Sequence, residues 1–268
     1  MERIAVYGKG GIGKSVIATG LSAHYAIGGR RVLHVGCDPK RDSSLRLIGH
    51  MPKRTVVDFV GMEPGAVTAS RLLEQGRHGV MCLESGGPEP GLGCGGRGVA
   101  RAIEIMEETD LLENGGFDVA VFDVLGDVVC GGFAAPLRQG FARKVVIVAS
   151  EEPMALFAAN NIARAVVTYH GNGVVLAGLV ANLRAAGQEA TLVERLAGAL
   201  GTRVLAVLPR DPMIIEAERR CTTVLDHAPD SAASRVLREL GSILDQVDPD
   251  RLAPPTPLSE DAFFELVR

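Results

Sequence analysis

The sequence GKGGIGKS at residues 8–15 constrains the fold of this chain more than any other feature. It is a phosphate-loop pattern, a glycine followed by four residues and then Gly-Lys-Ser, placed between an apolar segment at 3–7 and a helical pattern over 14–26. In that setting backbone N–H groups approach phosphates, Lys14 reaches the β- and γ-phosphates, and Ser15 offers a Mg²⁺ ligand. The flanking strand and helix argue against the alternative, a glycine-rich turn that binds no nucleotide. The predicted nucleotide-binding run is Gly8, Lys9, Gly10, Gly11, Ile12, Gly13, Lys14, Ser15 and Val16.

Short apolar segments alternate with helical patterns along the rest of the chain. Predicted strands cover residues 3–7, 31–36, 80–83, 117–122, 144–149, 174–180 and 203–207, and predicted helices cover 14–26, 99–108, 153–169, 189–200 and 231–244. The chain has no Trp and only 4% aromatic residues, so its core must rest on Val, Leu, Ile and Ala. We predict an α/β fold with a doubly wound, mainly parallel sheet. The candidate site residues must converge, so we expect one domain over residues 1–247 and a tail at 248–268.

The loop carries a second lysine, Lys9, beside its first glycine, and the phosphate-loop pattern does not require it. Its position resembles the signature lysine of the deviant Walker ATPases, dimeric enzymes in which this lysine contacts the nucleotide of the facing subunit. The resemblance implies that Lys9 is a catalytic residue acting across a subunit interface. The alternative is a solvated lysine without such a role.

Two acidic segments follow predicted strands, and loops at the carboxyl ends of parallel strands form the ligand site of such a sheet. In GCDPKRDSS, Asp38 and Asp42 could hold Mg²⁺ or its waters, with Lys40 near phosphate; Asp42 could instead cap a helix. In FDVLGD, Asp123 ends an apolar strand in the manner of a Walker B acid. Asp127 in the same turn is placed to orient the attacking water, so Asp38 and Asp127 are the acidic candidates for catalysis.

Two of the five cysteines, Cys94 in GLGCGGRG and Cys130 in DVLGDVVCGG, lie among glycines. An iron–sulfur cluster usually takes four thiolates, and a twofold dimer with both cysteines near its axis would supply them to one 4Fe–4S cluster. Taken alone, two such cysteines would more often be small buried residues or half of a zinc site. Asp127 lies three residues before Cys130, so movement of the first around a phosphate would displace the second. Cys37 and Cys82 lie in or beside apolar strands and are predicted to pack in the core.

Together these motifs resemble the nitrogenase iron protein family over about residues 3–245. The resemblance is carried by YGKGGIGKS, VGCDPKRDS, CLESGGPEPGLGCGGRGV, FDVLGDVVCGGFA and LPRD. It implies a P-loop NTPase of the deviant Walker A type that forms a homodimer and binds MgATP in each subunit, with Ser15 on the metal. It also implies a 4Fe–4S cluster held by Cys94 and Cys130, a ferredoxin or flavodoxin as electron donor, and docking to a separate catalytic partner.

Residues further along the chain acquire roles through the same resemblance. Asn182 in VANLR and the run Pro209, Arg210 and Asp211 in LPRD occupy positions similar to nucleoside contacts of the family. Arg97 would lie beside the cluster on the docking face, where some members undergo ADP-ribosylation. Residues 49–79 and the C-terminal tail do not follow the nitrogenase iron protein closely. We therefore favour a nitrogenase-like partner such as methylthio-alkane reductase; nitrogenase itself and tetrapyrrole-reducing systems are the alternatives.

Charge and hydropathy exclude other classes. The formal net charge of −4 argues against a protein that mainly binds nucleic acid, and no apolar run approaches the roughly 18 residues needed to span a bilayer. No signal-peptide pattern precedes the phosphate loop, so we expect a cytoplasmic protein that binds neither nucleic acid nor membrane. Two other classes share the loop. Partition or positioning ATPases need no cluster, and cluster-assembly scaffolds transfer a cluster whole.

Overall fold

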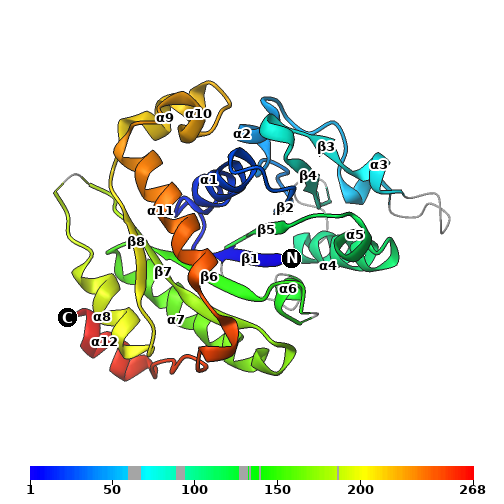
Figure 1. Cartoon of the computed structure of the whole chain (residues 1–268). Coiled ribbons are helices and arrows are strands. Elements are labelled where there is room, and N and C mark those ends of the chain that lie inside the picture. The colour runs from blue at the N-terminus through cyan, green and yellow to red at the C-terminus, as the bar shows by residue number, and fades with distance from the viewer. Residues whose placement is uncertain (60–67, 89–93, 127–131, 133, 139, 186) are drawn as a thin grey trace.

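The computed structural model describes residues 1–268 apart from 60–67, 89–93, 127–131, 133, 139 and 186. Its described residues form an eight-stranded sheet in the order β3-β4-β2-β5-β1-β6-β7-β8 (Figure 1). The parallel strands are β1 (Glu2–Tyr7), β2 (Val32–Cys37), β4 (Met81–Glu84), β5 (Val119–Val124), β6 (Lys144–Ala149), β7 (Val175–Asn182) and β8 (Val204–Leu208). The short β3 (Glu74–Gln75) pairs antiparallel with β4 at one edge. The predicted doubly wound, mainly parallel sheet is confirmed.

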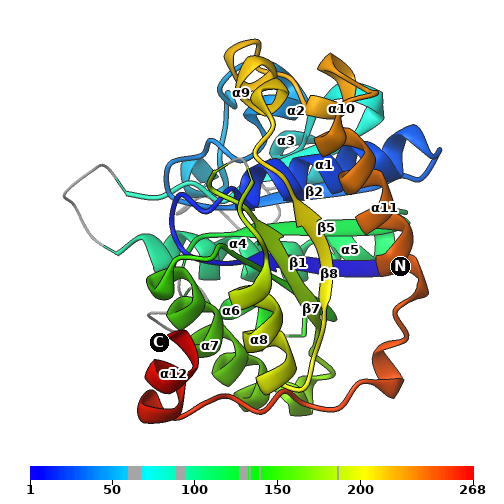
Figure 2. The same ribbon diagram turned by 90° about the vertical axis from the view of Figure 1, so that its left-hand side faces the viewer.

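Helices cover both faces of this sheet (Figures 1 and 2). One face carries α1 (Lys14–Ile27), α2 (Leu45–Ile48), α9 (Pro212–Arg219), α10 (Val224–His227) and α11 (Ala232–Gln246). The other carries α4 (Gly95–Glu108), α5 (Leu111–Asn114), α6 (Ala135–Arg138), α7 (Pro153–Thr168), α8 (Thr191–Ala199) and α12 (Glu260–Val267). The short α3 (Ala69–Leu72) and the 3-10 turns η1 (Val56–Phe59), η2 (Arg77–Gly79), η3 (His170–Asn172) and η4 (Pro249–Arg251) lie in the connections.

Each face of the sheet has its own apolar core layer. Along β2, Val32 packs in the layer beneath α1 and α11, whereas Leu33 and Val35 pack in the layer beneath α4 and α7. Successive side chains of a strand point to opposite faces, so a strand covered on both sides must be apolar throughout. In β2 a buried polar side chain interrupts this pattern, since His34 occupies the α1-facing side of the strand.

All seven predicted strands and all five predicted helices overlap an observed element. Among the elements that were not predicted, β3 consists of two polar residues and has no apolar period. Helix α9 follows LPRD directly: Asp211 is its N-cap and accepts a hydrogen bond from Met213 N, and Pro212 takes the first helical position. The helix is only 8 residues long and half-buried, which weakens its apolar period.

The segment predicted as a tail leaves α11 and returns along the opposite face of the sheet (Figure 2). Asn160 of α7 holds it through two hydrogen bonds to Leu258, one donated by the amide (3.0 Å) and one accepted from the backbone N–H (2.8 Å). Phe263 of α12 is fully buried and packs edge-on against Phe157 of α7. The tail therefore packs on its own chain. None of the described helices is both long and apolar enough to cross a bilayer.

Candidate functional site

The phosphate loop joins β1 to α1, and its glycines are required by close approaches. Gly8 has φ +147°, and a Cβ there would lie 2.3 Å from the carbonyl oxygen of Val148 in β6. Gly13, the N-cap of α1, has φ +95°, and its Cβ would lie 2.3 Å from Nδ2 of Asn182 in β7. Only glycine fits at either position, so β6 and β7 fix the path of the loop.

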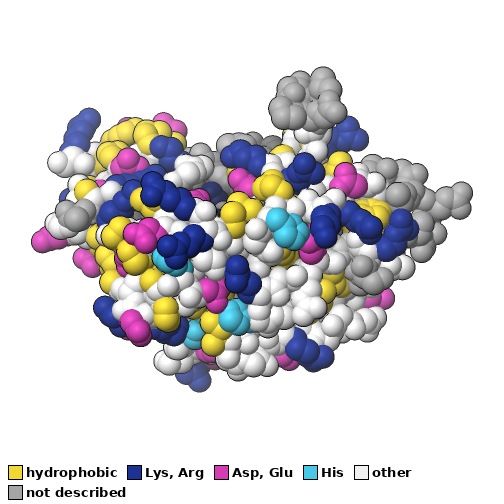
Figure 3. Space-filling view, turned by 90° about the horizontal axis from the view of Figure 1, so that it is seen from above, with side chains coloured by type: hydrophobic (Ala, Val, Ile, Leu, Met, Phe, Trp, Pro, Cys, Tyr) yellow, Lys and Arg dark blue, Asp and Glu magenta, His cyan; other side chains and the backbone are white. Residues whose placement is uncertain are grey.

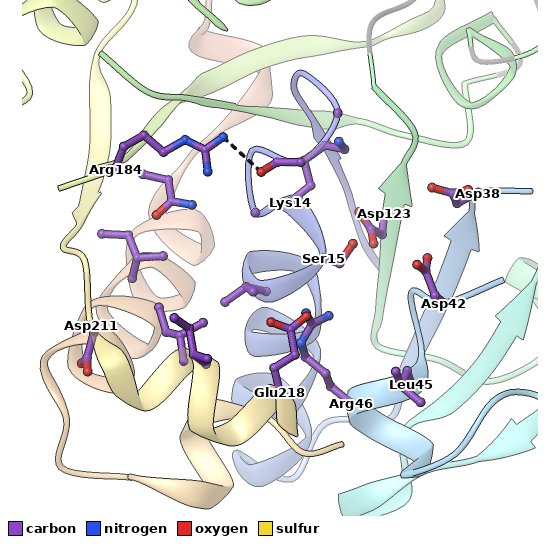
Figure 4. Close-up of a pocket in the computed structure, with 18 of the residues that line it drawn as sticks. Lys14, Ser15, Asp38, Asp42, Leu45, Arg46, Asp123, Arg184, Asp211 and Glu218 are labelled. Carbon is purple, nitrogen blue, oxygen red and sulfur yellow. Dashed lines mark hydrogen bonds and ion pairs between the residues drawn. The ribbon is translucent and has the colours of Figure 1, made fainter. Parts of the chain in front are cut away.

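A cavity of about 370 Å³ lies beside this loop, at the carboxyl ends of the parallel strands (Figure 4). This is where a doubly wound sheet binds its ligand. Its wall brings together most of the predicted nucleotide-binding residues, namely Gly10, Gly11, Gly13, Lys14, Ser15, Val16, Asp38, Lys40, Asp42, Asp123, Asn182, Pro209, Arg210 and Asp211. Gly8, Lys9 and Ile12 belong to the loop but do not line the cavity.

Three side chains donate hydrogen bonds to carbonyl groups of the loop. The buried Lys14 donates from Nζ to the carbonyl of Lys9 (3.1 Å). At the end of β7, Asn182 donates to the carbonyl of Ile12 (2.6 Å). The Arg184 guanidinium beyond it donates to the carbonyl of Gly11 (3.2 Å), the dashed line in Figure 4. These bonds hold the loop in shape without relying on a nucleotide.

Three carboxylates, those of Asp38, Asp42 and Asp123, lie on one side of the cavity (Figure 4). Asp123 in β5 is buried, and its Oδ2 accepts a hydrogen bond from Ser43 Oγ (2.5 Å). Burial raises the pKa of Asp38, the hydrogen bond from the Lys40 N–H lowers it, and the two neighbouring carboxylates raise it further. Asp38 thus lies among like charges on this side of the cavity.

This side of the cavity fits a hard divalent cation. Ser15 presents its hydroxyl at the start of α1 among the same lining residues as the carboxylates. Oxygen donors are the ligands that Mg²⁺ prefers, and a cation relieves the repulsion among clustered carboxylates. The residues present therefore suit a magnesium nucleotide, with phosphate near Lys14 and the cation near Ser15.

The opposite end of the cavity is formed by α2 and α9. Arg46 and Glu218 form an ion pair there (2.5 Å). Asp211, which was predicted as a nucleoside contact, accepts hydrogen bonds from Met213 N (2.9 Å) and Ala233 N (3.0 Å). Its carboxylate therefore caps α9 and tethers the start of α11 in addition to lining the cavity.

Eight lining residues were not predicted from the sequence: Leu45, Arg46, Leu125, Arg184, Leu208, Ile214, Ile215 and Glu218. Arg184 carried a usable signal, because it stands two positions after Asn182 at the end of a predicted strand. The residues of α2 and α9 carried none. Their place in the wall depends on how these two short helices pack across the strand ends.

Cys94 is the N-cap of α4, and its side chain is exposed. Gly132, which follows Cys130 by two positions, packs against the first turn of the same helix: a Cβ at Gly132 would lie 2.3 Å from the carbonyl oxygen of Gly96. The chain just after Cys130 is thereby brought against the start of α4. Asp127 and Cys130 themselves lie outside the described residues.

Pro39 joins this end of α4 to the cavity. A Cβ at Gly95 would lie 2.4 Å from Cγ of Pro39, so the proline ring rests on the helix start. Pro39 stands between Asp38 and Lys40, which both line the cavity. Arg97 is exposed on the same turn of α4. The loop that carries a candidate metal ligand therefore touches the turn that carries Cys94.

Two other cysteines are structural. Cys37 in β2 and Cys82 in β4 are buried, as predicted. Burial raises the pKa of both thiols, which keeps them protonated and unreactive. They pack as small apolar residues.

A phosphate loop between β1 and α1, with carboxylates after β2 and in β5, defines a P-loop ATPase. The fold is similar to that of the cell division ATPase MinD from Pyrococcus furiosus, with a TM-score of 0.73 and 21% identity over 92% of this chain and 100% of that chain. It is also similar to the septum site-determining protein MinD complexed with Mg-ADP from Pyrococcus horikoshii OT3 (TM-score 0.71, 20% identity, 92% and 97% covered). A third similar structure is cobyrinic acid a,c-diamide synthase from Mycobacterium smegmatis with bound ADP and magnesium (TM-score 0.64, 20% identity, 90% and 93% covered).

The sequence narrows the class further. A family model described as 4Fe-4S iron sulfur cluster binding proteins, NifH/frxC family, matches residues 2–268, and the chain belongs to this family. The resemblance to nitrogenase iron proteins is thereby confirmed. The protein is an ATP-hydrolysing enzyme of the nitrogenase iron protein kind.

Proposed function

We propose that this protein is an ATP-driven electron donor in which two copies hold one 4Fe–4S cluster between them and reduce a separate catalytic partner. The observation that carries the proposal is the contact of Gly132 with Gly96, which brings the segment after Cys130 to the helix start that carries Cys94. Four thiolates are the usual ligand set, and two copies would supply them. The family description, which names such a cluster, supports this assignment.

The setting of Cys94 suits a metal ligand. Its exposed thiol stands at the N-cap of a helix of 14 residues. Glycines at positions 95 and 96 allow another segment or a cluster to approach the backbone closely. When bound, the cluster would supply one-electron chemistry, while the protein would hold it and control its exposure.

The nucleotide residues take distinct roles in this proposal. Lys14 binds phosphate, Ser15 and Asp123 serve the Mg²⁺ ion, and Asp38 and Asp127 serve the attacking water. Lys9 does not line the cavity of its own chain, which favours a role at the nucleotide of the second copy. Asn182 and the run Pro209, Arg210 and Asp211 would bound the nucleoside.

Hydrolysis would reach the cluster through two connections. The first runs along the chain from Asp127 to Cys130. The second is the contact of Pro39 with Gly95, because any shift of the loop carrying Asp38 must move or release the first turn of α4. Because both proposed cluster ligands, Cys94 and Cys130, would be connected to the nucleotide site, we expect the cluster to move together with that site.

The catalytic partner would dock on the face that carries Cys94 and Arg97. We retain a nitrogenase-like partner such as methylthio-alkane reductase, with nitrogenase or a tetrapyrrole-reducing system as alternatives, and a ferredoxin or flavodoxin as the electron source. A cytoplasmic location and the division into an ATPase and iron–sulfur domain (1–247) and a tail (248–268) belong to the same proposal.

Iron analysis tests the cluster. Anaerobically purified protein should be brown and contain four iron and four sulfide per dimer. The variants C94S and C130S should each lose the colour and most of the iron, because a four-thiolate site without two of its ligands binds its cluster poorly. The matched control is C221S, whose half-exposed cysteine lies outside the proposed site and should leave iron unchanged. Full iron content in C94S would refute the ligand assignment.

The partner is tested by capture. Protein held with a nonhydrolysable ATP analogue under anaerobic conditions should retain a metalloprotein from cells of the source, and R97E should weaken that retention without changing iron content. Retention that is equal for R97E and wild type would place the docking face elsewhere.

A further inference from the structure

A chain of four buried polar side chains runs beneath the cavity. Ser22 Oγ lies 3.0 Å from Nδ1 of His34, His34 Nε2 lies 2.9 Å from Ser43 Oγ, and Ser43 Oγ lies 2.5 Å from Oδ2 of Asp123. Their exposed fractions are 0%, 0%, 1% and 4% in that order. Nucleotide binding by the phosphate loop requires none of the first three residues, so the chain needs its own explanation.

The protons of this chain can be assigned from one end. The Asp123 carboxylate only accepts, so the Ser43 hydroxyl must donate to it. Ser43 Oγ then accepts from His34, which places the imidazole proton on Nε2. The unprotonated Nδ1 accepts from the hydroxyl of Ser22. Every donor in the chain therefore points toward Asp123.

His34 is neutral in this arrangement. Burial lowers its pKa to about 4, and the charge of Asp123 opposes this only in part. A charged imidazole would donate from both nitrogens and would turn the Ser22 hydroxyl away from Nδ1. The neutral ring instead joins two hydroxyls in one direction.

This hydrogen-bonded chain of side chains connects four parts of the fold. Ser22 is on α1, the helix that begins at the phosphate loop, and His34 is on β2. Ser43 lies in the loop that carries Asp38 and Asp42, and Asp123 is on β5. An apolar residue at position 34 would suit the surrounding core layer, whereas a buried polar group is tolerated only when it is fully hydrogen-bonded.

We propose that His34 is a positioning residue for ATP hydrolysis, which holds the Ser43 hydroxyl toward Asp123 and so orients the carboxylate that serves the metal. The inference rests on the proposed role of Asp123 at Mg²⁺. Hydrogen bonds in series strengthen one another, so Ser22 and His34 reinforce the bond between Ser43 and Asp123. Fixing one oxygen of Asp123 leaves the other to face the cavity with its direction set in advance.

The first test reads the proton on the imidazole. In anaerobic protein labelled with ¹⁵N-histidine, the His34 resonances, identified among six histidines by their absence in H34Q, should show protonated Nε2 and unprotonated Nδ1 at pH 7. S22A should leave Nε2 protonated and shift the Nδ1 resonance. A proton on Nδ1, or on both nitrogens, would overturn the chain as assigned.

The second test compares affinity for MgADP with affinity for metal-free ADP by calorimetry. H34Q places an amide nitrogen near the former Nε2 and keeps the donor to Ser43, whereas H34N reaches only as far as Nδ1 and loses it. The preference for MgADP over metal-free ADP should fall about tenfold in H34N and less than about threefold in H34Q. V121A is the stability control, because Val121 pairs with His34 across the sheet and takes no part in the chain.

The outcomes distinguish a failure of the role of His34 from a failure of the proposed function. Equal metal preference in H34N, H34Q and V121A would overturn the role of His34, and so would a loss in V121A as large as in H34N. A wild-type protein with no preference for MgADP would instead remove Asp123 from the metal, which is a failure of the proposed function. Since both His34 variants are polar and of similar bulk, a folding defect affects them alike.

Discussion

A second buried acid lies beside Asp123. The strand register aligns Glu84 of β4 and Asp123 of β5 on either side of Gly36 in β2. Gly36 must be glycine, because a Cβ there would lie 2.0 Å from Oε2 of Glu84. Ser44 donates to Oε1 from both its backbone N–H and its hydroxyl (2.6 Å each). Glu84 thus anchors the end of the loop that carries the cavity acids.

The ionisation of Glu84 predicts how stability depends on pH. The pKa of Glu84 is raised from 4.5 to about 8, chiefly by burial; the hydrogen bonds from Ser44 oppose this rise, and the charges of Asp123 and Asp42 add to it. Below pH 4.5 the group is neutral in both the folded and the unfolded chain. Between pH 4.5 and about 8 the folded chain holds a proton that the unfolded chain has lost, so this contribution to the free energy of unfolding falls as pH rises.

The variant E84Q should remove that dependence. Urea unfolding at pH 5 and pH 8 should show a stability difference smaller than that of wild type by roughly a few kcal/mol, because glutamine has the same shape and does not ionise. Subtracting the pH dependence of E84Q from that of wild type cancels the contributions of the other titrating groups, which both proteins share. A pH dependence in E84Q equal to that of wild type would mean that Glu84 is ionised in the folded protein.

Among the helices, α4 carries the connection between nucleotide and cysteine. Its first turn contains Gly95, on which Pro39 rests, and Gly96, on which Gly132 rests. Two loops therefore meet one helix start, with Cys94 as its N-cap. Under the proposed function, a shift of Pro39 would displace this helix start and with it Cys94.

The variant G95A tests this contact. Its new methyl group would meet Cγ of Pro39 at 2.4 Å and force the two apart, so we expect destabilisation of about 1–3 kcal/mol. If Pro39 carries the coupling, MgATP should also stop changing the rate at which a chelator removes iron. The control is G198A in α8, which has open space around its Cβ and should be neutral or slightly stabilising. A normal MgATP effect in G95A would remove Pro39 from the coupling.

Seen whole, the molecule is weakly acidic, with a formal net charge of −4. On the face shown in Figure 3, basic and acidic side chains lie interspersed. The exposed Cys94 and Arg97 lie at the start of α4, close to Pro39 beside the cavity, and a second copy would complete the cluster site there. The proposed function therefore depends on pairing.

Mixed dimers test whether Lys9 acts on the nucleotide of the second copy. The variants K9A and K14A should each be inactive as homodimers in MgATP hydrolysis. A purified dimer of one K9A and one K14A subunit should recover about half the wild-type rate, since the intact Lys9 of one subunit would serve the intact loop of the other. No recovery in the mixed dimer would show that Lys9 acts within its own chain.

Two levels of information contributed to the site. Local patterns sufficed for the phosphate loop and for the acid at the end of a strand, which line the cavity as predicted. The glycine-flanked cysteines stay a prediction as cluster ligands. Local patterns failed for Arg46 and Glu218, which are ordinary surface residues until α2 and α9 meet at the cavity. They also failed for His34, whose partners come from α1, a loop and β5.

The sequence alone was enough to predict the alternation of strands and helices, the phosphate-binding loop and the family. Each of these depends on a pattern of apolar residues or glycines that spans only a few positions. Only the tertiary structure showed the contact of Pro39 with α4 and the row formed by Glu84, Gly36 and Asp123. The same holds for the hydrogen-bonded chain that runs from Ser22 to Asp123. These contacts join residues far apart along the sequence. Their existence depends on strand register and on which helix covers which face, and neither is written in any short segment.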